Sequence, residues 1–209
     1  MKIRYLDNMI PNPPIFQSIF AEQWEKLPPV MHKHYSNRPY CNDVVTVEGK
    51  MDVEFGWLVR SLSPFLRIFG ALVPYQGNDI PVTVHFRSEP DSGAYCLDRT
   101  FNFSYKKPYV FYSKMVAIKD DIIVEFMKYG IGWKHRFYYQ DDKVILEHRG
   151  YVWKIFGKTI PIPLGILLGR GYAEEEALDK NNFRMKMNIT HPVFGKMYEY
   201  RGRFEVIDE

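Results

Sequence analysis

The stretch from Tyr95 to Met115 reads YCLDRTFNFSYKKPYVFYSKM. Aromatic and polar residues alternate on both sides of residues 105–108, which end in Pro108. Alternation with a period of two is typical of a β-strand, and proline fixes the backbone angle φ in a way that suits a turn. The stretch therefore predicts a β-hairpin around which the rest of the chain is arranged.

An arginine shares one face of this hairpin with aromatic residues. Arg99, Phe101 and Phe103 point to the same side of the predicted strand, because successive side chains of a strand alternate between its two faces. A buried charge without a partner is unfavourable by several kcal/mol. We therefore expect Arg99 to contact a carboxylate, a ligand oxygen or the face of an aromatic ring.

Strand-like alternation continues from Gly77 to the end of the chain. Turn-forming residues interrupt it at intervals of roughly 8 to 12 residues, the spacing of an all-β sheet or barrel. In the segment 183–189, Phe183, Met185, Met187 and Ile189 share one face. The pattern predicts about ten antiparallel strands, which curl because long sheets twist.

Two helices are predicted before this region. In the segment 15–27, apolar residues recur at spacings of three and four, which is typical of an amphipathic helix. The segment 57–73 is more strongly apolar over about half of the helical wheel, with Arg60 and Arg67 opposite. Between the two, residues 42–55 predict a long strand with a bulge at Gly49.

The predicted fold class is α+β and mainly antiparallel β. We expect a strongly curved sheet or half-barrel of about ten strands, packed on the two N-terminal amphipathic helices. Residues 1–209 form a single predicted domain, with a helical part over about 14–75 and a β-sheet part over about 78–207.

Composition excludes several classes of protein. The net charge is only +3, and the 28 basic and 25 acidic residues are interspersed, so no nucleic-acid partner is expected. Two cysteines without a paired motif, and an N-terminus without the apolar run of a signal peptide, favour the cytoplasm. The most apolar run, residues 160–168, contains two prolines and is too short to span a bilayer, so no transmembrane segment is predicted.

Local catalytic motifs are missing from the sequence. It has no glycine-rich phosphate loop, no G-x-S-x-G, no H-E-x-x-H and no C-x-x-C, and nothing in it identifies a cofactor. His32 and His34 have the spacing of metal ligands on an extended segment, but we expect them to cap a helix or to make surface hydrogen bonds, and we predict no metal site.

Three further residues are candidates for a site with Arg99. Glu125 lies within an apolar run, His135 shares a face with aromatic residues, and Ser113 lies roughly opposite the strand of Arg99. An ionisable group on an apolar face is typical of a pocket, because burial shifts its pKa. Two alternatives remain open: these residues converge in a binding or catalytic site, or Arg99 and Glu125 form a structural ion pair.

A cleft is predicted where the second helix crosses an open mouth of the sheet. We expect Phe65, Phe69, Phe101 and Trp133 to line it and to bind an apolar molecule. Residues 157–164 predict an edge strand protected by prolines, or a crossing between sheet halves. The acidic run 174–176 is expected to be solvated.

Several short motifs, taken in order, resemble those of a known family. They are Leu27-Pro28 with His32, Gly56, Pro74 with Gly77 and Pro81, Arg99-x-Phe101 with Phe111-Tyr112-Ser113, Gly157 with Ile160-Pro161, and Pro192-x-x-Gly195 with Tyr200-x-Gly202. Over about Phe20 to Phe204 the chain resembles the bacterial family called domain of unknown function 4166. That resemblance implies a single domain, adds weight to Arg99 and Ser113, and implies a functional link to oxidoreductase-like domains, to which family members are attached in some proteins.

Three functions are compatible with these features. The first is a module that binds an apolar or lipid-like small molecule between helix and sheet, with Arg99 at its polar end. The second is a hydrolase- or isomerase-like enzyme that uses the same cavity, with Glu125 or His135 as the base. The third is a structural or regulatory protein that docks through exposed apolar surface.

Overall fold

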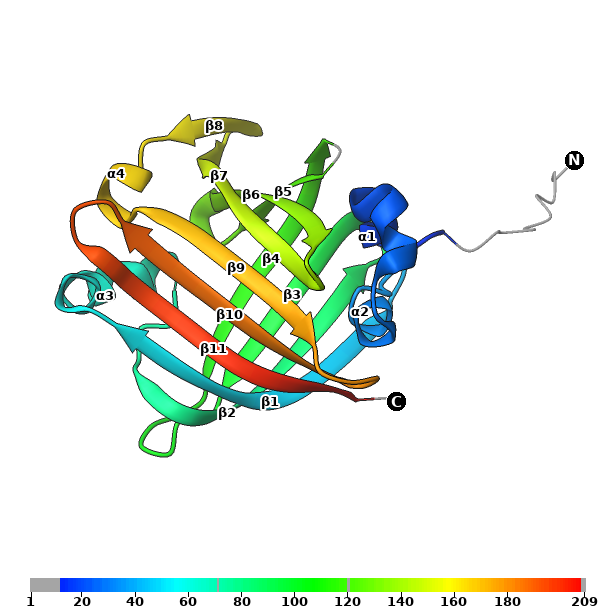
Figure 1. Cartoon of the computed structure of the whole chain (residues 1–209). Coiled ribbons are helices and arrows are strands. Elements are labelled where there is room, and N and C mark those ends of the chain that lie inside the picture. The colour runs from blue at the N-terminus through cyan, green and yellow to red at the C-terminus, as the bar shows by residue number, and fades with distance from the viewer. Residues whose placement is uncertain (1–11, 71, 120, 208–209) are drawn as a thin grey trace, which may run out of the picture.

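The computed structural model describes residues 12–70, 72–119 and 121–207, without the side chains of Phe65 and Phe69. Most of these residues form antiparallel strands (Figure 1). The strands are β1 (Val44–Phe55), β2 (Gly77–Glu89), β3 (Ser92–Phe101), β4 (Tyr109–Lys119), β5 (Ile122–Phe126), β6 (Ile131–Gln140), β7 (Lys143–Ile155), β8 (Lys158–Ile162), β9 (Arg170–Ala177), β10 (Asn182–His191) and β11 (Gly195–Ile207). The predicted hairpin is formed by β3 and β4, with Arg99 paired to Phe111 across it.

Ten of these strands close into a barrel. Neighbours along the sheet follow the order β6-β5-β4-β3-β2-β1-β11-β10-β9-β7, and pairing of β6 with β7 completes the ring. Strand β8 pairs with β7 outside the ring and is an edge strand, as the prolines in residues 157–164 predict. The fold class is confirmed, and the curved sheet is a closed barrel rather than a half-barrel.

Short helices lie at the ends of the barrel. Helix α1 (Ile15–Phe20), the 3₁₀ helix η1 (Ala21–Lys26) and α2 (Pro29–His34) lie at one end, and α3 (Trp57–Phe69) lies at the other (Figure 1). Two smaller elements, η2 (Lys128–Gly130) and α4 (Gly165–Leu168), complete the described helices. No helix in these parts of the chain is long and apolar enough to cross a membrane.

The first helix is not continuous, contrary to the prediction for residues 15–27. Helix α1 ends at Phe20 because Ala21 has a φ of 48°, outside the helical region, and a 3₁₀ helix follows. Both pieces still bury aromatic residues. Phe16 packs on Tyr95 and Phe137 of the barrel wall, with ring centroids 4.9 and 5.2 Å apart. The N-terminal helices therefore close this end of the barrel.

Two other expectations about local structure were wrong. The register of β1 against β2 shifts between Met51 and Val53, so the bulge is not at Gly49. A Cβ atom at Gly49 would lie 2.7 Å from the Phe204 ring, so glycine is needed there for close packing. In α3, the apolar residues Trp57 and Ile68 are exposed, so the helix covers the barrel end with only part of the apolar face predicted for residues 57–73.

Candidate functional site

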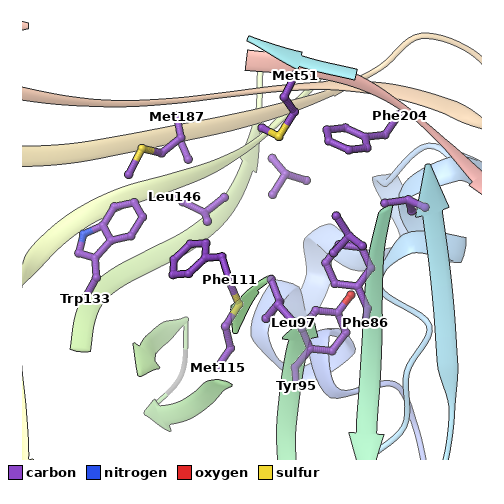
Figure 2. Close-up of a cluster of buried hydrophobic side chains, with 14 of the residues drawn as sticks. Met51, Phe86, Tyr95, Leu97, Phe111, Met115, Trp133, Leu146, Met187 and Phe204 are labelled. Atoms are coloured by element: carbon purple, nitrogen blue, oxygen red, sulfur yellow. The ribbon is translucent and has the colours of Figure 1, made fainter. Parts of the chain in front are cut away.

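The interior of the barrel contains a cavity of about 70 Å³. Every strand of the closed ring contributes to its lining, and Figure 2 shows side chains that point from different walls toward a common centre. Most of the lining is apolar and includes three methionines, Met51, Met115 and Met185. Its polar side chains are Arg99, Glu125, Glu175 and Tyr200.

Trp133 forms a wall of this cavity. Its ring also lines a second, apolar cavity of about 40 Å³. Leu164, just before α4, and Leu168, within α4, line the same cavity. The indole lies against Gly171, where an added Cβ atom would be 2.7 Å from the ring. Its Nε1–H donates a hydrogen bond to Nδ1 of His148 at 2.8 Å. The indole thus separates the two cavities and is held in place by a hydrogen bond.

The candidate arginine lies in a buried cluster of hydrogen bonds. Nη2 of Arg99 donates to Oγ of Ser113 at 2.5 Å and to Oε1 of Glu125. Oγ of Ser113 donates to the same Glu125 oxygen at 2.6 Å. The guanidinium carbon lies 4.3 Å from the centroid of the Phe111 ring. Arg99 therefore makes both contacts predicted for it, one with a carboxylate and one with an aromatic face.

Arg99 retains donors that these contacts do not use. Both hydrogen bonds leave from Nη2, and among the described residues no group accepts one from Nε or Nη1. A guanidinium donates from all three of its nitrogens and matches the geometry of a carboxylate. Because Arg99 lines the cavity, these free N–H groups are suited to an oxygen atom of a molecule inside it.

Glu125 is ionised by its surroundings despite its burial. Burial alone would raise the pKa of this carboxyl group. The charge of Arg99, with smaller contributions from His135 and from the hydrogen bonds of Ser113 and Arg99, outweighs burial and holds the pKa of Glu125 below its usual range. The cluster is therefore an ion pair, as one of the two alternatives predicted, and its residues Arg99 and Glu125 also line the cavity.

His135 lies next to this cluster and is fully buried. Neither of its ring nitrogens has a hydrogen-bond partner among the described residues. Burial lowers the pKa of His135 to about 4, although the charge of Glu125 opposes the shift. The ring is therefore neutral at pH 7 and packs between Trp133 and Phe137, with centroids 4.6 and 5.1 Å away.

A second buried carboxylate faces the same cavity. Glu175 on β9 accepts a hydrogen bond from the hydroxyl of Tyr35 at 2.6 Å and lies 3.4 Å from Nε2 of His34. Burial raises its pKa, but His34 and the hydrogen bond from Tyr35 outweigh burial, and the pKa of Glu175 lies below its usual range. The expectation that residues 174–176 are all solvated was wrong for Glu175, and His34 is buried rather than on the surface.

Tyr200 lines the same cavity and is close enough to both clusters to be affected by their charges. Burial raises the pKa of Tyr200 to about 12, Arg99 lowers it, and the charges of Glu125 and Glu175 raise it. The described residues supply no hydrogen-bond partner for this hydroxyl group. Tyr200 is thus a second polar group available to a molecule in the cavity.

The remaining predicted site residues fall into two groups. Phe101 and Trp133 line the interior cavity together with Arg99 and Glu125. The side chains of Phe65 and Phe69 lie outside the described part of the chain. The described lining of this cavity comes from strands, so the candidate site lies inside the barrel, and the cleft predicted beside α3 stays a prediction.

Sequence reasoning missed Glu175, Tyr200, His34 and Tyr35 as members of the site. A signal for Glu175 was present, because on a strand the middle residue of an acidic run points away from the outer two. It shares its face with the small residues Gly171 and Ala173, which leave space inside a barrel. His34 and Tyr35 had no comparable signal, because they reach Glu175 from the N-terminal helices.

Among the residues that the structure describes, no group of three or more His, Cys, Asp or Glu side chains is placed to hold a metal ion. The buried carboxylates are instead satisfied by Arg99, Ser113, His34 and Tyr35.

Comparison with known proteins identifies the family. No curated protein matches the chain. A family model described as a domain of unknown function, DUF4166, matches residues 27–204, a range that contains all the residues of the cavity described above. Because this match covers most of the chain, the protein belongs to the DUF4166 family.

Proposed function

We propose that the barrel binds a small molecule with an apolar body and an anionic or carbonyl end. The observation that carries this proposal is the guanidinium of Arg99, which is largely buried on the wall of an apolar cavity and has N–H groups for which no described residue supplies an acceptor. Small-molecule sites combine an apolar lining with a few polar groups that fix orientation. Arg99 and the hydroxyl group of Tyr200 would be those groups.

The volume of the cavity limits the size of the ligand. A cavity of about 70 Å³ holds two or three water molecules, whereas sites for drug-sized ligands measure roughly 300–1,000 Å³. A larger ligand therefore needs space that side chains occupy. Met51, Met115 and Met185 are suited to release it, because methionine is unbranched and adapts its shape. A shift of the Trp133 ring would add the neighbouring cavity of about 40 Å³.

Catalysis in the same cavity is the alternative function. A general base works best with a pKa near the operating pH. Arg99 holds the pKa of Glu125 low, and burial lowers that of His135 to about 4, so neither group is matched to neutral pH. Ser113 donates its hydrogen bond to Glu125, which is too weak a base to activate it. These features favour binding over hydrolase- or isomerase-like chemistry.

Calorimetric titration with octanoate and with octanol tests the proposal. The two compounds have the same apolar chain, but only the acid offers a carboxylate to Arg99. We expect the protein to bind octanoate about tenfold more tightly or better, because hydrogen bonds to charged groups contribute about 1.5–3 kcal/mol. Replacing the ion pair with Arg99→Met and Glu125→Leu keeps the interior filled and should abolish the preference.

Arg184→Met is the matched control, because Arg184 is an exposed arginine on β10 that pairs with Glu176. This variant should retain the preference for the acid. Two results would contradict the proposal: neither compound binds, or the Arg99→Met/Glu125→Leu protein still prefers octanoate.

A further inference from the structure

The β7–β8 hairpin, α4 and the turn before β11 lie at the outside of the barrel (Figure 1). Each of the three carries exposed apolar side chains. We call this set the apolar edge: Phe156, Ile160, Ile166, Leu167, Val193 and Phe194. Nε2 of His191 donates a hydrogen bond to the carbonyl oxygen of Ile166 at 3.0 Å, which holds the turn beside α4. The turn before β11 is thus held against α4, and α4 follows β8 directly along the chain.

Phe156 occupies the tip of the hairpin in an unfavourable conformation. Phe156 and Gly157 are the two turn residues between the paired residues Ile155 and Lys158, and their φ angles are 48° and 76°. A turn with positive φ at both positions favours Asn-Gly, and an aromatic residue is strained there. The side chain is also 97% exposed, so it contributes no packing. A strained and exposed phenylalanine indicates a role outside the fold.

Within residues 148–173, which include the tip of the β7–β8 hairpin and α4, the charged side chains have one sign, whereas Lys196, next to the turn before β11, pairs with Glu54 and Glu199. From His148 to Ala173 the sequence contains four basic residues and no aspartate or glutamate. Lys154, Lys158 and Arg170 are exposed, and among the described residues none of them pairs with a carboxylate. Lys154 lies 5.6 Å from the centroid of the Phe126 ring. Apolar side chains flanked by unpaired cations are typical of surfaces that bind anionic lipids.

The same segment is poorly suited to pairing with another protein strand. Strand β8 is an edge strand, and Pro161 in it cannot donate a backbone hydrogen bond to a new neighbour. Pro163 follows directly after the strand. These prolines argue against strand addition by a second copy of the chain, whereas a bilayer requires no such pairing.

We propose that the apolar edge docks on the surface of an anionic lipid bilayer. Phe156 and Ile166 enter the boundary between headgroups and acyl chains, and Lys154, Lys158 and Arg170 lie near the lipid phosphates. This inference goes beyond the proposed function and does not depend on it. Leu164 and Leu168, next to the exposed part of α4, line the second cavity, so docking would bring that cavity close to the bilayer.

Sedimentation with vesicles tests the inference. We expect the protein to bind vesicles of equimolar phosphatidylglycerol and phosphatidylcholine, and to bind pure phosphatidylcholine at least tenfold more weakly. Added salt should weaken binding, and Lys154→Gln with Lys158→Gln should weaken it by about fivefold for each lysine. The decisive variant is Phe156→Asn, which should lower vesicle binding about tenfold and raise the melting temperature, because asparagine relieves the strained turn.

Val110→Ser is the control, because Val110 is an exposed apolar residue on β4 outside the apolar edge. This variant should bind vesicles like the wild type. The Arg99→Met/Glu125→Leu protein should also bind vesicles normally, which separates this inference from the proposed function. Absence of vesicle binding, equal binding to both lipid mixtures, or a dimer in light scattering that Phe156→Asn dissociates would overturn the inference.

Discussion

Glu125 and Glu175 are two buried carboxylates that face one cavity, yet they are neutralised in different ways. Glu125 pairs with Arg99 from within the barrel wall, and Ser113 on the strand between them binds both. Glu175 pairs with His34 and Tyr35, which belong to the helical end of the molecule. Both have a pKa below the usual range. The two clusters therefore differ in the residues that neutralise the carboxylate, and not in the direction of the pKa shift of the carboxylate itself.

The partners of the two carboxylates differ in the charge that they leave behind when a mutation removes the carboxylate. A guanidinium keeps its charge in proteins, so removal of Glu125 would leave an uncompensated cation in the barrel wall. The partners of Glu175 are an imidazole and a phenol, and both side chains have neutral forms, so removal of Glu175 leaves hydrogen-bonding groups rather than an obligatory charge. The first cluster is consequently more sensitive to mutation, and its permanent charge makes it the better anchor for an anionic ligand.

The largest effect is expected at Glu125. Glu125→Leu should destabilise the protein by about 3–5 kcal/mol, because it removes one partner of a buried ion pair. Adding Arg99→Met should restore most of this loss, since the pair is then replaced by apolar side chains of similar size. Urea unfolding of the two variants measures both values. A double variant no more stable than Glu125→Leu alone would show that the pair is not the source of the loss.

A pH effect of similar size is expected from His135. Its pKa is about 4 in the folded protein and about 6.5 in an unfolded chain, so between these values only the unfolded chain binds the proton. Stability should therefore fall as the pH is lowered from 6.5 to 4, by on the order of 3 kcal/mol. Urea unfolding at several pH values measures the slope.

His135→Phe is the comparison for this slope. His148 also has a lowered pKa, but it is present in both proteins and cancels in the difference. The variant should lose less stability than the wild type over the same pH range, whatever its stability at pH 7. Equal slopes of stability against pH in the two proteins would contradict the prediction. They would mean that His135 binds its proton as readily in the folded protein as in the unfolded chain.

A smaller loss is expected at Glu175. Glu175→Leu should cost about 1–3 kcal/mol, the range for leaving buried hydrogen-bonding groups such as the Tyr35 hydroxyl without a partner. Measured side by side with Glu125→Leu, it tests the comparison between the clusters directly. A loss at Glu175 that equals or exceeds the loss at Glu125 would reverse the ranking derived from the partners.

The smallest effect is expected for an ion pair on the outer surface. Arg184 on β10 binds Glu176 on β9 at 2.6 Å, and its side chain is about half exposed. Arg184→Met should change the free energy of unfolding by less than about 1 kcal/mol, because solvent screens exposed pairs. Thermal unfolding in low and high salt measures this change. It serves as the reference for the larger losses of stability expected at Glu125 and Glu175.

The strands of the barrel could be predicted from the sequence because most of them bury one face over much of their length. Alternation in β10 and β11 was visible for this reason, and the same logic placed Arg99 on the inner face. Closure could not be predicted, because it depends on the pairing of β6 with β7 and of β7 with β9. Alternation within single strands does not specify which edges meet.

The candidate site was predictable in part for the same reason. Arg99, Ser113 and Glu125 lie on consecutive strands, so strand faces alone bring them near one another. Tyr35 and Glu175 are 140 residues apart in the chain and meet only because the N-terminal helices close the barrel end. Contacts of that kind leave no periodic pattern in the sequence.

Quenching of Trp133 fluorescence by a brominated medium-chain fatty acid tests the central claim most directly. Of the four tryptophans, Trp133 lines the interior cavity, whereas Trp57 is exposed on α3. Two proteins, each retaining one of these and carrying phenylalanine at the other three positions, would be titrated side by side. We predict saturable quenching of Trp133 and only weak, non-saturating quenching of Trp57. Unquenched Trp133, or identical behaviour of the two proteins, would contradict a ligand site inside the barrel.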